Sequence, residues 1–181
     1  MNRLGTRWLT FVVAVVILTA ASVAAVAAFR GGSDGGASLS LASCQPAGPQ
    51  GAVVQVQLTD RGSAMMGGTA MMVSLRIDQA SAPGGKVTFV ATNTGALNHE
   101  LLVLPVPADG PGTRPVGTDG KIDEAPSLGE ASKSCGAGAG DGITPGTRSW
   151  VTVDLKPGTY ELLCDIPWHY ADGMFGEIVI T

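Results

Sequence analysis

The chain contains the run Cys164-Asp-Ile-Pro-Trp-His169-Tyr-Ala-Asp-Gly-Met174-Phe-Gly-Glu-Ile-Val-Ile-Thr181, in which a thiol, an imidazole and a thioether are spaced five residues apart. Strand-like residues end at Cys164 and begin again near Gly176, so the three donors lie in one short loop between two predicted strands. Such a loop can close three soft or borderline ligands around one metal ion. The loop therefore predicts a metal site that needs a further ligand from elsewhere in the chain.

That further ligand is predicted to be His99, the only other histidine, which lies within Leu97-Asn-His99-Glu-Leu-Leu-Val-Leu104. Two imidazoles, a thiolate and a weak thioether form the ligand set of a type 1 (blue) copper site, because sulfur suits Cu(I) and imidazole suits both oxidation states. We expect one copper ion per chain, bound by His99, Cys164, His169 and Met174. Ordinary core or surface roles for these four residues are the alternative.

The segments Asn98-His-Glu-Leu101 and Cys164 to Gly176 resemble those of the cupredoxins. The four-residue gaps on both sides of His169 are more similar to rusticyanin and the sulfocyanin-like proteins than to plastocyanin or azurin. The resemblance covers roughly Val53 to Thr181 and implies a Greek-key β-sandwich of about seven or eight strands. It also implies that His99, Cys164 and His169 are the strong equatorial ligands and Met174 the axial one. Plastocyanin and azurin carry Asn after the first histidine, whereas this chain has Glu100.

Composition favours the same fold class. The chain has 181 residues, a formal net charge of −4, 26 glycines and only 14% charged residues. The scarcity of basic residues argues against nucleic-acid binding, which needs concentrated Lys and Arg. Short Val, Ile, Thr and Leu runs between turn signals predict an all-β domain with long loops. In one such run, Tyr160, Leu162 and Cys164 share a parity that turns the thiol toward the core.

Residues 1–30 are predicted to be a membrane anchor. Trp8 to Phe29 carry no charge, and as a helix these 22 residues would span roughly 33 Å, against about 30 Å for a bilayer core. The run is longer than the apolar region of a cleavable signal peptide, but Ala25-Val-Ala27 is an acceptable cleavage site, so cleavage stays an alternative. In either case we expect the following domain outside the cytoplasm, on the cell membrane as a single-pass protein or secreted or periplasmic.

Residues 31–51 are predicted to be a flexible linker, and residues 52–181 a cupredoxin domain with a long Gly/Pro-rich loop at 105–148. A loop of this length in a compact domain is either functional or disordered unless something holds it. Leu128 is the large apolar residue that we expect to anchor the middle of this loop.

Three cysteines are present, and copper would take Cys164. An oxidising exterior favours a disulfide between the other two, Cys44 and Cys135, and this bridge would hold the far end of the long loop. Cys44 also ends the run Leu41-Ala-Ser-Cys44, which matches a bacterial lipoprotein box. Acylation of Cys44 is therefore the alternative.

Met65, Met66, Met71 and Met72 cluster in the sequence, and thioethers are soft donors, so an auxiliary Cu(I) site is one interpretation. The favoured interpretation is that these side chains fill the loop surface and begin a strand, because methionine packs adaptably into irregular gaps.

The sequence shows no acid/base pair, nucleophile constellation or open metal position, so we expect no enzyme activity. We expect a carrier of single electrons between redox-partner proteins of the respiratory or another electron-transfer chain. The ring edge of His169, flanked by Trp168 and Tyr170, would be the electron port. A protein that binds, stores or delivers copper is the alternative function, and an adhesion-like β-sandwich without metal is a third.

Overall fold

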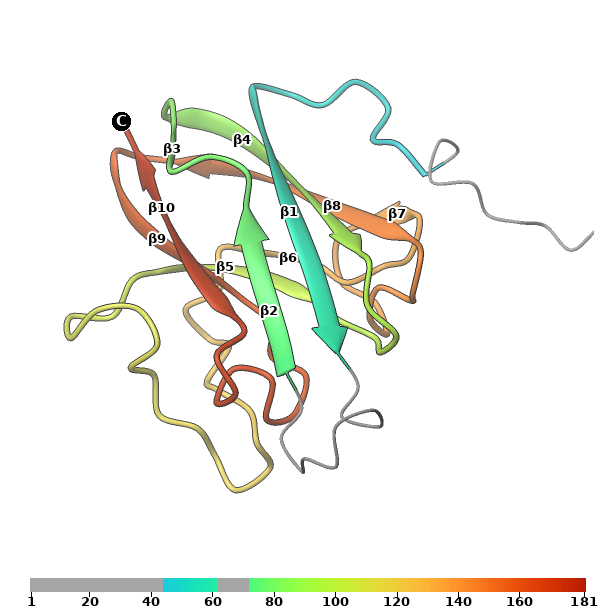
Figure 1. Ribbon diagram of the computed structural model, residues 1–181. Helices are drawn as coiled ribbons and strands as arrows, with labels where there is room; N and C mark the ends of the chain where they lie inside the picture. Colours follow the sequence, from blue (N-terminus) through green and yellow to red (C-terminus); the bar gives the residue numbers. More distant parts are fainter. Residues whose placement is uncertain (1–43, 62–71) are drawn as a thin grey trace, which may run out of the picture. The chain divides into compact units, whose positions relative to one another are not determined.

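The computed structural model describes residues 44–61 and 72–181 (Figure 1). The predicted anchor, most of the predicted linker, and Met65, Met66 and Met71 lie outside these residues. The described part contains no helix, and therefore none long and apolar enough to cross a membrane. It contains ten strands: β1 (Ala52–Arg61), β2 (Met72–Ile77), β3 (Ser81–Ala82), β4 (Gly85–Asn93), β5 (Leu101–Pro105), β6 (Gly129–Ala131), β7 (Gly136–Ala137), β8 (Arg148–Leu155), β9 (Gly158–Leu163) and β10 (Phe175–Ile180).

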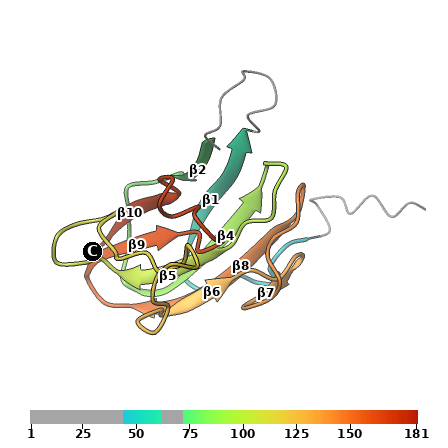
Figure 2. The same cartoon turned by 90° about the horizontal axis from the view of Figure 1, so that it is seen from below.

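The strands form two five-stranded sheets, seen as two layers in Figure 2. The first sheet has the order β2-β1-β4-β8-β7 and the second has the order β3-β10-β9-β5-β6. Both sheets are mixed, because β1 pairs in parallel with β4, β7 with β8, and β3 with β10. The predicted all-β class is confirmed.

The predicted number of seven or eight strands is too low, since the described residues form ten. The three strands that were not predicted are β3, β6 and β7, each only two or three residues long. A run this short contains too few side chains to display an alternation of apolar and polar residues. Two of them, β6 and β7, lie inside the segment 105–148, where the sequence indicated only a loop.

The core lies between the two sheets, and strand alternation explains how it is filled. In β1 the side chains of Val54, Val56 and Leu58 are buried while Gln55 and Gln57 are exposed. Successive residues of a strand point to opposite faces, so one face of β1 contributes apolar surface and the other meets water. Phe89 of β4 is fully buried in the same cluster, and its truncation to alanine would cost about 3 to 5 kcal/mol.

A disulfide joins Cys44 to Cys135, as predicted, across a sequence separation of 91 residues. Cys135 lies next to β7, and its N–H donates to the Arg148 carbonyl at 2.7 Å, so the bridge attaches the residues before β1 to the edge of the first sheet. The alternative of an acylated Cys44 is wrong for this fold, because its sulfur is used in the bridge.

The connection from β5 to β6, residues 106–128, is anchored by a residue other than the predicted one. Leu128 is 44% exposed, whereas Ile122 is buried in a small cluster on the outer side of the second sheet. Its apolar neighbours there are Leu102, Leu104, Leu163 and Tyr170. A lone isoleucine between Lys121 and Asp123 gives no periodic signal, so the sequence alone did not single it out.

Candidate metal centre

The predicted donors are brought together at one end of the second sheet. His99 precedes β5, Cys164 follows β9 and Met174 precedes β10, and β9 lies between the other two strands. Leu163, the last residue of β9, pairs with Leu102 on one side and with Phe175 on the other. The residues just beyond these pairs therefore converge, and the Cys164 N–H donates to the Met174 carbonyl at 3.1 Å.

All four predicted donors are buried, and three of them face one another. The Nδ1 atoms of His99 and His169 are 3.3 Å apart, and Cys164 Sγ lies 3.9 Å from the first and 3.4 Å from the second. These separations leave a point about 2 Å from all three atoms, which is close to the roughly 2.0 to 2.3 Å of zinc bonds to imidazole and thiolate. The trio therefore fits a single first-row metal ion.

Asp60, at the end of β1, orients the His99 ring. Its Oδ1 lies 2.9 Å from His99 Nε2 and also accepts the N–H groups of Ala96 and Leu97 at 2.8 and 3.0 Å. Burial alone would raise the pKa of Asp60, but the hydrogen bonds from Leu97, His99 and Ala96 outweigh it and hold the pKa below its usual value. An ionised carboxylate can only accept, so Nε2 carries the proton and the lone pair of Nδ1 faces the other donors.

The backbone of His99 is held by residues of the long connection and of β4. His99 and Ile143 exchange two backbone hydrogen bonds, at 3.2 and 2.6 Å. The buried Asn93 side chain, at the end of β4, donates to the carbonyls of Ile143 and Leu97 at 2.6 and 2.7 Å. Hydrogen bonds thus fix the backbone at His99 itself and at Leu97 just before it, so the imidazole projects from a rigid segment.

The protonation states of the trio also suit a metal. Burial lowers the pKa of His99 despite the neighbouring Asp60, and burial followed by the nearby His99 lowers the pKa of His169. Both rings are therefore neutral donors near pH 7. Burial raises the pKa of the Cys164 thiol to about 12, and the Glu100 N–H, 3.4 Å from Sγ, offsets this only in part. A coordinating metal ion removes that proton, which the protein alone would not do.

Met174 is fully buried in the core cluster that includes Cys164. Its N–H donates to the His169 carbonyl at 2.9 Å, and further turn hydrogen bonds at Ile166, Trp168 and Tyr170 fold the loop back on itself. Backbone bonds thus join Met174 to both other donor residues of the loop. Its role as axial ligand stays a prediction.

Residues 106–128 lie against the metal loop, and two glycines allow the close approach (Figure 1). Gly120 accepts a 2.8 Å hydrogen bond from the Trp168 N–H, and a β-carbon on Gly120 would come within 2.8 Å of Trp168. At Gly112 a β-carbon would come within 2.2 Å of the Phe175 ring. Both glycines also have positive φ values, 81° and 79°, which disfavour other residues.

A buried polar network fastens the same connection to β9. The Glu161 carboxylate, which is completely buried, pairs with Arg114 Nε at 2.6 Å and accepts the Gly112 N–H at 2.7 Å. The Tyr170 hydroxyl donates to Glu161 at 3.1 Å and accepts the Arg114 N–H at the same distance. The network connects the strand before Cys164 with the loop that carries His169.

Beside the metal donors, carboxylate oxygens of Glu100, Glu124 and Asp165 lie within 4.8 Å of one another. Burial raises the pKa of Glu100 to about 7 and that of Asp165 to about 6. Glu100 directly follows the donor His99 and Asp165 directly follows the donor Cys164, so this acidic cluster adjoins the metal centre in sequence.

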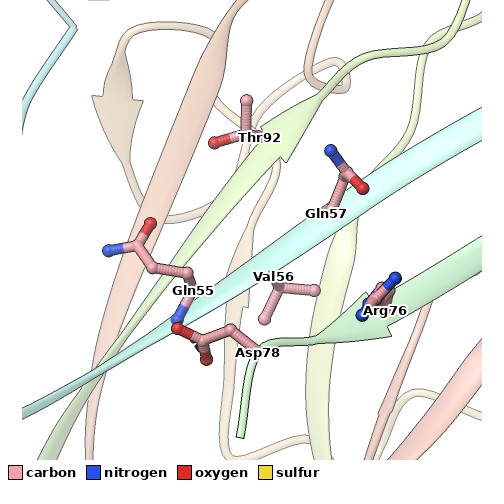
Figure 3. Close-up of a pocket in the computed structure, with 6 residues that line it drawn as sticks. All are labelled: Gln55, Val56, Gln57, Arg76, Asp78 and Thr92. Carbon is pink, nitrogen blue, oxygen red and sulfur yellow. Dashed lines mark hydrogen bonds between the residues drawn. The ribbon is translucent and has the colours of Figure 1, made fainter.

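A hollow of about 300 Å³ lies on the polar outer face of the first sheet. Figure 3 shows side chains from β1, the β2 end and β4 around it, and the Gln55 N–H donates to Asp78 Oδ1 at 3.1 Å. It contains none of the metal donors and no pair of groups suited to acid–base chemistry. Its lining residues are Gln55, Val56, Gln57, Arg76, Asp78 and Thr92.

Sequence reasoning missed Asp60, Asn93, Ile143 and Arg114. Only Asp60 left a readable signal: it continues the core-facing parity of Val54, Val56 and Leu58 at the end of a predicted strand. A carboxylate that faces the core needs a hydrogen-bond donor or a cation as its partner. Here that partner is the His99 imidazole.

Comparison with known proteins gives one family match and several similar solved structures. The family model described as the sulfocyanin (SoxE) domain matches residues 80–181. Auracyanin from the photosynthetic bacterium Roseiflexus castenholzii is 20% identical, with a TM-score of 0.44 over 74% of this chain and 99% of that one. Rusticyanin from Thiobacillus ferrooxidans is 24% identical, with a TM-score of 0.45 over 76% of this chain and 85% of that one. A search of curated proteins finds no significant match.

Proposed function

Because the chain belongs to the sulfocyanin family of cupredoxins, we propose that it is an exported, membrane-tethered carrier of single electrons between redox-partner proteins. Electron transfer is the general function of cupredoxins, and His99, Cys164 and His169 are placed to bind one copper ion. Copper, when bound, supplies a one-electron change between Cu(II) and Cu(I).

The observation that carries this proposal is the rigidity of a preformed donor trio. His99 is fixed through its ring by Asp60 and through its backbone by Ile143, and Cys164 is bonded to the backbone of Met174. Donors that keep their positions in both oxidation states lower the reorganisation that accompanies each transfer. The burial of all three donors argues against direct binding of a substrate to the metal.

His169 is the proposed exit for the electron. It is 3% exposed, while the adjacent Trp168 is 54% exposed and the following Tyr170 is buried. We therefore place the docking patch around Trp168, whose ring lies over Gly120. Redox partners with an apolar contact area would fit such a patch, because exposed aromatic residues are enriched at protein interfaces.

Met174 is proposed as the axial ligand, since it is buried beside the trio and belongs to the same closed loop. Residues 1–30 are proposed as the anchor and the residues after them as a linker, on the strength of the uncharged run. The disulfide supports an extracytoplasmic location, because such bridges persist in oxidising compartments.

The test is an absorption spectrum of the copper-loaded full-length protein in detergent, followed by repeated oxidation and reduction. An intense visible band that returns fully after each cycle, with copper retained, is the expected result. Loss of copper during cycling would favour the alternative of copper storage or delivery. Absence of the band in the oxidised protein would reject the type 1 site itself.

A further inference from the structure

The three carboxylates beside the metal donors meet on the outer face of the second sheet. Glu100 continues the parity of Leu102 and Leu104 in β5, and Asp165 continues the parity of Leu163 in β9. These leucines pack with Ile122 outside the sandwich, whereas Cys164 belongs to the interior cluster. Glu100 and Asp165 thus point away from the copper donors that precede them in sequence.

Two of the three carboxylates are buried and have an oxygen without a hydrogen-bond partner. Glu100 is 7% exposed and Asp165 is fully buried. Asp165 Oδ1 accepts the Ile122 N–H at 2.7 Å, which fixes the carboxylate, but Asp165 Oδ2 and Glu100 Oε1 accept no hydrogen bond. Leaving buried carboxylate oxygens without a partner is unfavourable, so these two atoms point to a missing cationic ligand.

Lys121 is the cation beside these carboxylates, but it pairs with only two of the three. Its Nζ lies 3.2 Å from Glu124 Oε1 and 3.5 Å from Asp165 Oδ2, the latter an ion pair without a hydrogen bond. One ammonium faces three carboxylates, and the structure gives Glu100 Oε1 no partner. The Lys121 side chain is 37% exposed, so it can move into solvent without unfolding its surroundings.

We propose that Glu100, Glu124 and Asp165 form a binding site for a hard divalent cation such as Ca²⁺, with Lys121 swinging out when the cation binds. Carboxylate oxygens suit hard cations and do not suit Cu(I). Oxygens bound to one Ca²⁺ at about 2.3 to 2.6 Å each lie at most roughly 5 Å apart. The three carboxylates each offer an oxygen within 4.8 Å of the others, so they meet this limit.

This site goes beyond the proposed electron-transfer function. Glu124 belongs to the connection that covers the metal loop, while Glu100 and Asp165 follow two copper donors in sequence. A cation held by all three would tie the connection to the ends of β5 and β9. It would thereby stabilise the folded state by an amount that grows with the logarithm of the cation concentration once this exceeds the dissociation constant.

The test is calorimetric titration of the copper-loaded full-length protein in detergent with CaCl₂, against NaCl of equal ionic strength. We expect saturable binding of one Ca²⁺ per chain. Glu124→Gln should weaken it by about tenfold or more, since a direct charged ligand contributes at least roughly the 1.4 kcal/mol that a factor of ten represents. Glu177→Gln, an equal charge change at an exposed position of β10, should leave the affinity unchanged.

Lys121→Gln supplies a change of opposite sign. If the ammonium competes with the cation, removing it should tighten Ca²⁺ binding. Weaker binding in Lys121→Gln, no saturable heat with the unsubstituted protein, or equal affinities for Glu124→Gln and Glu177→Gln would each overturn the proposal. The visible copper band of every variant reports that the fold is intact. If the unsubstituted protein lacked the copper band, the proposed electron-transfer function would be contradicted. The calorimetric titration would still test the cation site by itself.

Discussion

The two sheets contribute differently to the metal centre. The second sheet carries every predicted donor: His99, Cys164 and Met174 flank the neighbouring ends of β5, β9 and β10, and His169 lies in the loop from β9 to β10. The first sheet contributes no donor, yet Asp60 at the end of β1 holds the His99 ring, and Asn93 at the end of β4 holds the adjoining backbone. The identity of the ligands is thus a property of one sheet, and their orientation depends on the other.

The largest effect should follow from removing a donor of the second sheet. Cys164→Ser replaces the thiolate, which is the strongest ligand and the source of the intense visible absorption of type 1 sites. We expect the blue or green band to vanish while the β-sandwich stays folded, as recorded by absorption and circular dichroism. An unchanged band would contradict the ligand assignment.

Removing the support from the first sheet should weaken the site without abolishing it. Asp60→Ala deletes the acceptor at His99 Nε2, and loss of such a partner typically costs 10- to 100-fold in metal affinity. Competition with a chelator would measure the loss. Asp60→Asn, which keeps an accepting oxygen, should recover most of the affinity, and Asp154→Asn, at an exposed position of β8, should have no effect. Equal affinities for Asp60→Ala and the unsubstituted protein would mean that the donors orient themselves.

The bridge at the edge of the first sheet should affect stability more than colour. The Cys44→Ser, Cys135→Ser double variant opens a closed loop of 91 residues, which on the chain-entropy account lowers the free energy of unfolding by roughly 3 to 5 kcal/mol. Denaturant unfolding would measure this, and the visible band of the folded protein should persist.

Thiol counting tests the bridge itself. The unfolded, non-reduced, copper-free protein should show one thiol, that of Cys164, and three after reduction. Three thiols before reduction would exclude the bridge.

The smallest effect on binding is expected at the axial position. Met174→Leu keeps the apolar volume but removes a weak, long bond, so copper should be retained while the reduction potential rises. Protein-film voltammetry would measure the potential, and metal analysis after dialysis the retention. Copper loss on dialysis would identify Met174 as a principal ligand.

The difference between the sheets also explains how far the sequence reaches. Donors are recognised by residue type and spacing, so His99, Cys164 and His169 could be found, together with the long strands, which alternate visibly. Ile143 and Asn93 act through backbone atoms or amides that many residue types could supply, so no local pattern marks them. Arg114 and Glu161 meet only because the connection returns to β9 from 47 residues away in sequence, and no local pattern marks that return.

The disulfide and the donor trio interleave along the chain. The bridge closes a loop over residues 44–135, and a metal joining His99 to Cys164 would close a second loop over residues 99–164. The two loops overlap, and neither contains the other. Residues 99–135 belong to both loops. If one link is broken, the other still constrains this segment. In an unfolded chain that keeps copper on His99 and Cys164, the two links share a segment and do not restrict the chain independently. Bridge reduction should then destabilise the copper-loaded protein less than the copper-free one.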